Sequence, residues 1–183
     1  MEKIALIDLD STIVHTTKGW LNVLNNEFCK QVTLEDLKTW DTITEIFPKK
    51  RGYQVLDSPY FYQKHVKPIE GSLEFLKELK EIGYTLKLLT ASNKNESKIE
   101  YINENFPDVF SELIFDPLKY KHKGDVIVDD NFGHVYEHIK ANDSKGFLYL
   151  HHGKYLYSDV RWHNRNFHRA MSYESILKRL RDD

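Results

Sequence analysis

Two aspartates, Asp8 and Asp10, stand two residues apart directly after the short apolar run of residues 4–7. The run is long enough for a buried strand and too short for a helix. Side chains at positions i and i+2 share one face of a strand, so the two carboxylates can converge where the strand ends. Close acids at a buried strand end are costly unless they share a proton or bind a cation. The pair therefore points to acid–base or metal chemistry, although solvated or helix-capping aspartates would give the same short pattern.

Three later segments also carry reactive side chains, two of them directly after a short apolar run. They supply, in chain order, a hydroxyl, a lysine and a second pair of acids: Thr90 after residues 86–89, Lys119 in the basic segment 119–123, and Asp129 with Asp130 after residues 126–128. Open α/β sheets bind their ligands beyond the carboxyl ends of their strands. We therefore expect the acids of the first and last segments to gather at one site.

This ordered set resembles the four motifs of the haloacid dehalogenase superfamily of phosphohydrolases, which are Asp-x-Asp-x-Thr, Thr or Ser, Lys, and a paired acid. All four are present, and together they involve most of the chain. The resemblance implies that Asp8 is the nucleophile that attacks phosphorus. It implies that Asp10 is the general acid and base, which protonates the leaving alkoxide and then activates water. Asp8 must then be ionised while Asp10 is protonated at the start of the reaction.

The same resemblance implies a Mg²⁺ cofactor and a phosphate cradle. Its metal ligands are expected to be Asp8, Asp129 and the backbone carbonyl of Asp10, with Asp130 supporting the shell or contacting a bound water. Mg²⁺ suits such an oxygen-only shell with several waters retained. Thr90 is expected to hydrogen-bond a phosphoryl oxygen, aided by backbone N–H groups.

The basic segment 119–123 contains three candidates for the phosphate lysine. Spacing to Asp129 in the resembled family favours Lys119, and Lys123 matches a second basic position that we assign, with Ser92, to substrate binding. A solvated loop position is the alternative for each lysine, Lys121 included.

Residues 15–66 interrupt the alternation of strands and helices with an aromatic-rich, mostly helical segment. In the superfamily an insertion at this point is a cap that closes over the site, and a helical cap of this size resembles the 5′(3′)-deoxyribonucleotidase branch. Residues 67–71, 98–102 and 119–130 carry further local likenesses to that branch. The candidate stacking surfaces for a nucleobase in the cap are Trp20, Trp40, Phe47, Tyr60 and Phe61, of which Trp40 and Phe47 are assigned to substrate binding; the alternative is that these aromatics form the core of the cap.

Outside the cap, short strands and amphipathic helices alternate along the chain. The strands are expected at residues 4–7, 84–89, 113–115, 126–128 and 146–150, and the helices at residues 72–82, 94–105, 132–141 and 172–181. We therefore predict an α/β fold, a Rossmann-like parallel sheet with helices on both faces. Residues 1–14 and 67–183 form the catalytic core and residues 15–66 the helical cap. The basic and aromatic segment 163–169 is expected to be a surface loop.

Composition excludes several classes of protein. The 183 residues carry a net charge of −2 and a pI near 6.5, which is no footprint for stable nucleic-acid binding. The chain has no apolar run of about 18 residues, so neither a membrane span nor a membrane partner is expected. A single cysteine, Cys29, excludes an intrachain disulfide framework and is expected as a small core residue. Nine histidines without a supporting cysteine or a His-Glu-x-x-His motif do not favour a zinc site. A cytoplasmic location follows as an expectation, and formation of a homodimer stays open.

The leading hypothesis is a Mg²⁺-dependent phosphomonoesterase that converts small-molecule nucleotides, deoxyribonucleoside monophosphates, to nucleoside and phosphate. One alternative keeps the chemistry but changes the substrate to a sugar phosphate, another small metabolite or a polynucleotide end. Another is a non-catalytic member that binds a phosphorylated ligand or a protein. Against this last reading, every catalytic position holds a competent residue type.

Overall fold

A six-stranded parallel sheet forms the centre of the computed structural model, which describes residues 2–37, 42–94, 96–150 and 164–182. Its strands are β1 (Lys3–Ile7), β2 (Tyr84–Thr90), β3 (Glu112–Phe115), β4 (Val126–Asp129), β5 (Lys145–Tyr149) and β6 (Phe167–Ala170). They lie in the order β3-β2-β1-β4-β5-β6. The order reverses between β1 and β4, and such a switch point opens a crevice at the carboxyl ends of the strands. The predicted fold class is confirmed.

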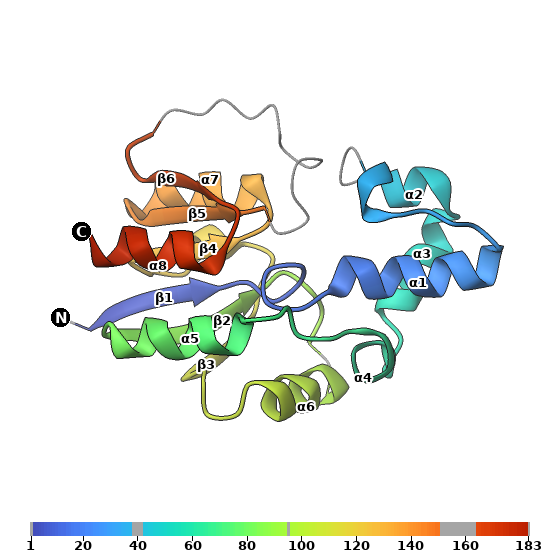
Figure 1. The fold of residues 1–183 in the computed structure, drawn as a ribbon, viewed down its shortest axis with the longest axis horizontal. Helices are drawn as coiled ribbons and strands as arrows, with labels where there is room; N and C mark the ends of the chain where they lie inside the picture. Colours follow the sequence, from blue (N-terminus) through green and yellow to red (C-terminus); the bar gives the residue numbers. More distant parts are fainter. Residues whose placement is uncertain (1, 38–41, 95, 151–163, 183) are drawn as a thin grey trace.

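Helices cover both faces of this sheet (Figure 1). Four of them belong to the core: α5 (Ser72–Glu81), α6 (Glu96–Asn105), α7 (Phe132–Asn142) and α8 (Tyr173–Arg181). Helices α5 and α8 pack against each other in front of the sheet, and α7 packs behind it on β4 and β5. The close approach of α7 requires a glycine on β5, because a Cβ atom at Gly146 would lie 2.6 Å from side-chain atoms of Val135 and Ile139.

The packing of β1 explains why residues 4–7 are all apolar. Ala5 and Ile7 join the larger hydrophobic cluster, whereas Leu6 packs with Leu89 and Ile127 in a second cluster. All five side chains are at most 1% exposed. A strand that is buried on both faces has no polar side to alternate with, which explains the continuous apolar run before Asp8.

Between β1 and α5 the chain forms a separate group of short helices, the cap helices. They are α1 (Thr16–Phe28), the 3₁₀ turn η1 (Leu34–Asp36), α2 (Thr42–Ile46), α3 (Lys49–Leu56) and α4 (Phe61–His65). The turn η1 has a capping box, in which the backbone N–H of Thr33 donates to Asp36 Oδ2 over 2.8 Å. The cap helices lie beside the carboxyl ends of the strands, and α4 contacts the core helix α6.

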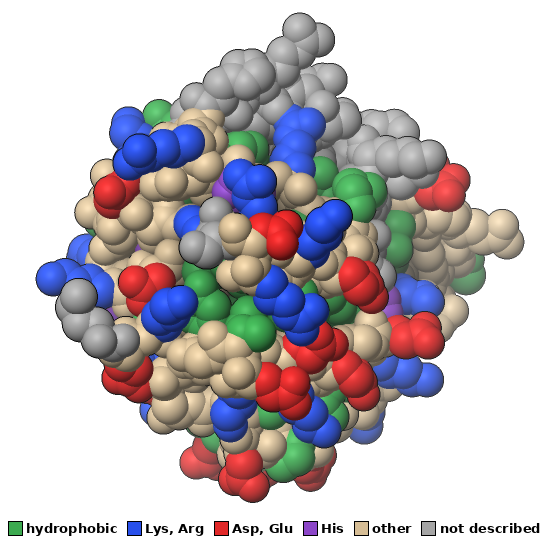
Figure 2. Space-filling view, turned by 60° about the vertical axis from the view of Figure 1, so that its left-hand side comes forward, with side chains coloured by type: hydrophobic (Ala, Val, Ile, Leu, Met, Phe, Trp, Pro, Cys, Tyr) green, Lys and Arg blue, Asp and Glu red, His purple; other side chains and the backbone are tan. Residues whose placement is uncertain are grey.

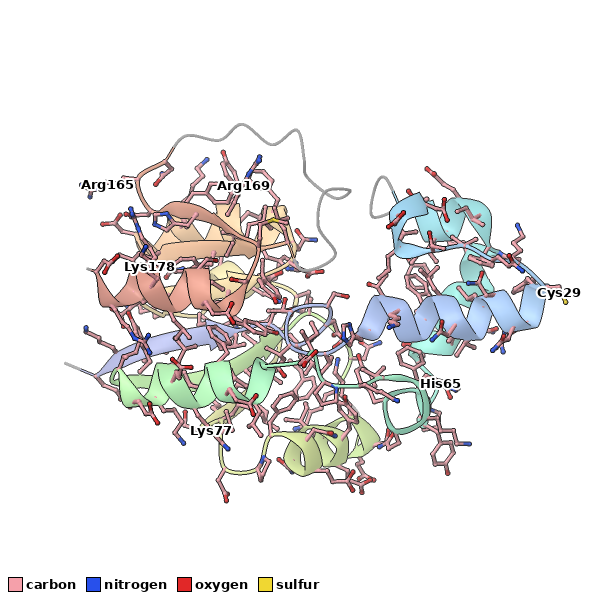
Figure 3. The ribbon with its side chains drawn as sticks, viewed as in Figure 1. Cys29, His65, Lys77, Arg165, Arg169 and Lys178 are labelled. Atoms are coloured by element: carbon pink, nitrogen blue, oxygen red, sulfur yellow. The ribbon has the colours of Figure 1, made fainter. Side chains whose placement is uncertain are left out.

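Two expectations about the fold were wrong. The segment expected as a surface loop overlaps β6, which pairs in parallel with β5 from Gly146–Phe167 to Tyr149–Ala170. This edge strand has four residues with a histidine and an arginine among them, so its sequence carries no apolar run. The expected core residue Cys29 is exposed at the far tip of the cap helices, just after the end of α1 (Figure 3). It ends the helix in a left-handed conformation with a φ of 51°, where the chain turns away from the core of the cap.

The surface around the chain termini mixes charges of both signs. Figure 2 shows Lys and Arg side chains interspersed with Asp and Glu side chains on this face. Arg165 and Lys178 come from the β6 and α8 region on the same side of the molecule (Figure 3). None of the helices in the described residues has the length and apolarity of a membrane span.

Candidate active site

The carboxyl ends of β1 and β4 bring the first and last acidic motifs together. Backbone pairing continues one step past β1, where Asp8 N donates to the Val128 carbonyl over 2.9 Å. The Thr12 hydroxyl then links the two motifs, because it donates to Asp8 Oδ2 over 3.0 Å and accepts from the backbone N–H of Asp130 over 3.1 Å. Asp8 and Asp129 are 5% and 0% exposed. The threonine of Asp-x-Asp-x-Thr thus fixes the separation of two buried acids.

One of the three candidate lysines lies between these acids. The Lys119 Nζ atom is 2.5 Å from Asp8 Oδ1 and 2.6 Å from Asp129 Oδ2, and the residue is 2% exposed. Lys121 and Lys123 are both exposed. Of the segment 119–123, Lys119 is therefore the lysine that neutralises the buried carboxylates.

Helix α7 holds the short 3₁₀ turn η2 (Lys119–Lys121) that carries this lysine. His138 Nε2 lies 2.9 Å from the His122 carbonyl oxygen, which closes the turn, and His138 Nδ1 lies 2.7 Å from Ser144 Oγ. A carbonyl oxygen only accepts, so Nε2 carries the hydrogen and Nδ1 accepts from the serine hydroxyl. The neutral ring therefore joins the turn to the helix.

Burial and charge set the protonation of the acidic cluster. Burial raises the pKa of Asp8 to about 6, against the lowering effect of Lys119. Burial also raises the pKa of Asp130 well above its ordinary value, with Asp8 and Asp129 adding to the rise. Burial opposes ionisation of Asp129 too, but Lys119 and His134 hold the pKa of Asp129 below its usual range. Burial alone would lower the pKa of Lys119, but the two carboxylates raise it. The cluster therefore holds more acid than one lysine can neutralise.

This excess of carboxylate fits a divalent cation. Ligand oxygens of Asp8, Asp129 and Asp130 all lie within 4.8 Å of one another. The donor set consists of oxygens alone, which is the set that Mg²⁺ takes in proteins. His134 Nδ1 lies 3.2 Å from Asp129 Oδ2, so it can orient that ligand from outside.

The second aspartate of the pair faces the cap. Asp10 Oδ1 accepts from Thr16 Oγ1 over 2.7 Å and from Tyr62 Oη over 2.6 Å. Asp10 Oδ2 accepts from Lys98 Nζ over 3.0 Å and from Thr90 Oγ1 over 3.2 Å. Burial would raise the pKa of Asp10, but Lys98 and the hydrogen bonds from Tyr62 and Thr16 lower it to about 2. This order of pKa values, with Asp8 above Asp10, is the reverse of the order expected from the sequence.

Sequence reasoning missed three of the four donors to Asp10. Lys98, on α6, is 0% exposed and also contacts the Ser92 hydroxyl. A signal for it was present, because Lys98 shares the buried stripe of α6 with Tyr101 and Ile102, three and four residues later. Tyr62 and Thr16 gave no such signal, since only the docking of the cap helices brings them to Asp10.

A cavity of about 370 Å³ opens beside Asp10, between the cap helices and the loop after β2. The Trp20 ring forms one wall and is fixed by a 2.9 Å hydrogen bond from its Nε1 atom to the Gly52 carbonyl. The lining residues come from α1, α3, α4, α6 and the ends of β1 and β2. They are Asp10, Ser11, Thr16, Thr17, Trp20, Tyr53, Leu56, Asp57, Tyr62, Ala91, Ser92, Asn93 and Lys98.

The residues predicted to bind substrate are distributed unevenly around this cavity. Ser92 lines it. Phe47 does not: it is 2% exposed and packs inside the cap, with its ring centroid 5.9 Å from that of Phe28. Lys123 is exposed and does not line the cavity either. Trp40 lies outside the described residues. Of the other candidate stacking aromatics, Trp20 lines the cavity, whereas Tyr60 and Phe61 do not. Tyr53 and Tyr62 complete its aromatic walls.

Solved structures support the fold. A haloacid dehalogenase-like hydrolase from Streptococcus pneumoniae superposes with a TM-score of 0.69 at 12% identity, covering 98% of each chain. A protein described as a predicted phosphatase from Clostridium acetobutylicum gives a TM-score of 0.67 at 17% identity, covering 100% of each chain. The haloacid dehalogenase hydrolase YfnB from Bacillus subtilis, solved bound to magnesium, gives 0.61 at 11% identity, covering 98% of each chain. At these identities the likeness establishes a shared fold.

Sequence comparison identifies the family to which this chain belongs. A curated 5′(3′)-deoxyribonucleotidase from Clostridium acetobutylicum is 29% identical over 154 residues, which cover 81% of this chain and 82% of that protein. The model of the family described as "5' nucleotidase, deoxy (Pyrimidine), cytosolic type C protein" matches residues 2–179. The chain therefore belongs to this nucleotidase family, within the haloacid dehalogenase superfamily, and its enzyme class is that of the phosphoric monoester hydrolases.

Proposed function

We propose that the chain hydrolyses deoxyribonucleoside monophosphates to nucleoside and phosphate through an aspartyl-phosphate on Asp8. The observation that carries the proposal is the placement of Asp8, which lies among Lys119, Asp129 and Asp130 at a strand end, close to a cavity with aromatic walls. In this proposal residues 15–66 act as a cap over the core formed by residues 1–14 and 67–183. The curated relative supports the substrate class, since it is a 5′(3′)-deoxyribonucleotidase.

In the first half-reaction the Asp8 carboxylate attacks phosphorus, and the ester bond to the nucleoside oxygen breaks. Lys119 neutralises part of the negative charge that gathers around the phosphoryl group. Held by Asp8, Asp129 and Asp130, Mg²⁺ would supply further positive charge against the phosphoryl oxygens. Thr90 and Lys98 stand at the end of β2 and the start of α6. Both side chains donate hydrogen bonds to the Asp10 carboxylate, and both can instead donate to a phosphoryl oxygen.

Asp10 protonates the leaving alkoxide, and it then takes a proton from the water that attacks the aspartyl-phosphate. In the free protein four donors keep Asp10 ionised. A phosphate dianion that takes the hydrogen bonds of Thr90 and Lys98 would remove two of these donors and place negative charge nearby. Both changes raise the pKa of Asp10, so binding of the substrate itself would prepare the acid.

The cavity suits a nucleoside better than a small polar sugar. Trp20, Tyr53 and Tyr62 offer aromatic surface, and Asp57 and Asn93 add polar groups at its edge. Stacking of one base on an aromatic side chain contributes about 1–3 kcal/mol in proteins that bind single strands.

A phosphate-release assay tests the proposal. The substrates are the deoxyribonucleoside and ribonucleoside monophosphates and a set of sugar phosphates, each with Mg²⁺ and with EDTA. We expect turnover of deoxyribonucleotides that requires Mg²⁺ and falls at least about 10³-fold in Asp8→Asn, because a carboxamide is no nucleophile. Preference for sugar phosphates would contradict the substrate assignment, and full activity of Asp8→Asn would contradict the mechanism.

A further inference from the structure

We propose that Tyr62, on the cap helix α4, is a positioning residue that holds the Asp10 carboxyl group toward the leaving oxygen. This inference rests on the proposed function, since it concerns how the general acid of that reaction is aimed. It assigns to the cap a role in the chemical step in addition to enclosing the substrate.

The contact itself is short and sheltered. The Tyr62 hydroxyl donates to Asp10 Oδ1 over 2.6 Å, and Tyr62 is 5% exposed. Burial, followed by the negative charge of Asp10, raises the pKa of Tyr62 well above its ordinary value. The phenol is therefore the donor of this hydrogen bond and the carboxylate the acceptor. Hydrogen bonds to a charged acceptor are about twice as strong as neutral ones.

The Tyr62 ring has little freedom to move. It meets the Phe61 ring edge-on with a centroid distance of 5.4 Å, and the Tyr101 ring of α6 lies 5.6 Å away. Lys98 Nζ is 4.6 Å from the centroid of the same ring. Because cap and core residues both hold the ring, its hydroxyl is a fixed point for the Asp10 carboxyl group.

The two oxygens of Asp10 have different partners, and this difference defines the orientation of the carboxyl group. Thr16 and Tyr62, both from cap helices, bind Oδ1, whereas Thr90 and Lys98, both from the core, bind Oδ2. If phosphate takes over the core donors, Oδ1 keeps its two cap partners. These partners then alone determine where the carboxyl group points while it delivers its proton. Misplacement of a reacting group by 1 Å can cost about 10²-fold in rate.

The test compares two substrates whose leaving groups differ in their need for a general acid. A nucleoside alkoxide is a poor leaving group and requires a proton, whereas nitrophenolate from p-nitrophenyl phosphate leaves readily without one. Hydrolysis of the aspartyl-phosphate is common to both substrates, so the comparison uses kcat/KM, which reports the steps up to departure of the leaving group. For Tyr62→Phe we expect kcat/KM for a deoxyribonucleoside monophosphate to fall about tenfold or more. We expect kcat/KM for p-nitrophenyl phosphate to fall less than about threefold, since its leaving group needs no proton. Asp10→Asn removes the general acid altogether and so gives the largest expected difference between the two substrates.

Two further variants make the test specific. Tyr101→Phe is the matched control: it removes a hydroxyl from the neighbouring ring, and among the described residues that buried hydroxyl has no hydrogen-bond partner. It should leave the ratio of the two kcat/KM values unchanged. Thr16→Val removes the other cap donor and should shift the ratio in the same direction as Tyr62→Phe.

Equal losses of kcat/KM with both substrates would assign Tyr62 to packing or substrate binding, and no loss with either would show that it has no role; both outcomes overturn the inference. Failure of the proposed function looks different. In that case the wild-type protein would release no phosphate from either substrate, or Asp8→Asn would remain active. A thermal melt of each variant separates misfolding from a kinetic defect.

Discussion

At the scale of single residues, the centre of the site depends on one buried ammonium group. Lys119 Nζ contacts both Asp8 and Asp129, and all three residues are at most 5% exposed. Removal of a partner from a buried charge pair typically costs about 3–5 kcal/mol, because the remaining charges stay desolvated and unpaired. The lysine thus stabilises the folded protein and also prepares the site for a dianion.

Lys119→Met should therefore lower the free energy of unfolding by about 3–5 kcal/mol in EDTA. Added Mg²⁺ should recover part of this loss, because a cation at the carboxylates replaces the missing charge. Urea unfolding of the wild type, Lys119→Met and the exposed-residue control Lys121→Met measures both effects. A Lys119→Met protein as stable as the wild type in EDTA would refute this account of the cluster.

At the scale of elements, helix α7 supports the turn that carries the lysine. His138 bonds to the carbonyl of His122, and the Asn142 side chain donates to the carbonyl of Tyr120 over 2.9 Å. His138 is 0% exposed, and burial holds its pKa below the ordinary 6.5. The ring must stay neutral to accept from Ser144, so this support depends on pH.

The sign of that dependence follows from proton linkage. Below about pH 6.5 the unfolded chain binds a proton at His138 that the folded protein resists, so the contribution is present above that pH and is lost as the pH falls. His138→Gln should lower the free energy of unfolding by about 1–3 kcal/mol at pH 7.5, where a buried hydrogen-bond network is broken. The difference between the two proteins should shrink between pH 7 and pH 5, as urea unfolding at each pH can show. A difference that stays constant or widens would contradict the assignment.

The elements also show which structural features can be predicted from residues that are adjacent in the sequence. Strand ends that carry Asp8, Thr90 and Asp129 were predictable, because a run of buried residues and the polar residue after it are adjacent in the chain. The choice of Lys119 came from the family resemblance, whose spacing to Asp129 favours it over Lys121 and Lys123. Edge strand β6 was not, since it is short and half polar. Its partner β5 supplies the pairing that its own residues do not signal.

At the scale of the whole molecule, the cavity beside Asp10 is lined by residues of both the cap helices and the core. Composition showed that the cap is rich in aromatics but not which of them face inward. Phe47 was assigned to the substrate and lies in the core of the cap, whereas Tyr53 was not singled out and lines the cavity at 47% exposure. The donors Thr16, Tyr62 and Lys98 were missed for the same reason. Contacts between distant segments are set by docking, and no local pattern records them.

Tyr53→Ala should therefore raise KM for deoxyribonucleoside monophosphates roughly tenfold, the equivalent of about 1.4 kcal/mol of lost stacking. Inhibition by inorganic phosphate should not change, since the phosphate cradle is intact. Stability should also change little, because Tyr53 is half exposed. Tyr60→Ala is the matched control, an aromatic that is 62% exposed and does not line the cavity. An unchanged KM, or an equal loss of affinity for inorganic phosphate, would exclude Tyr53 as a base contact.

The most direct measurement of the central claim is the detection of phosphate on Asp8 during turnover. The enzyme is mixed with a deoxyribonucleoside monophosphate and Mg²⁺, quenched in acid within one turnover, digested and examined by mass spectrometry. We expect the peptide that contains Asp8 to gain the mass of one phosphoryl group in the wild type and not in Asp8→Asn. An unmodified Asp8 peptide from an enzyme that is turning over, or a phosphoryl group on a different residue, would contradict the mechanism.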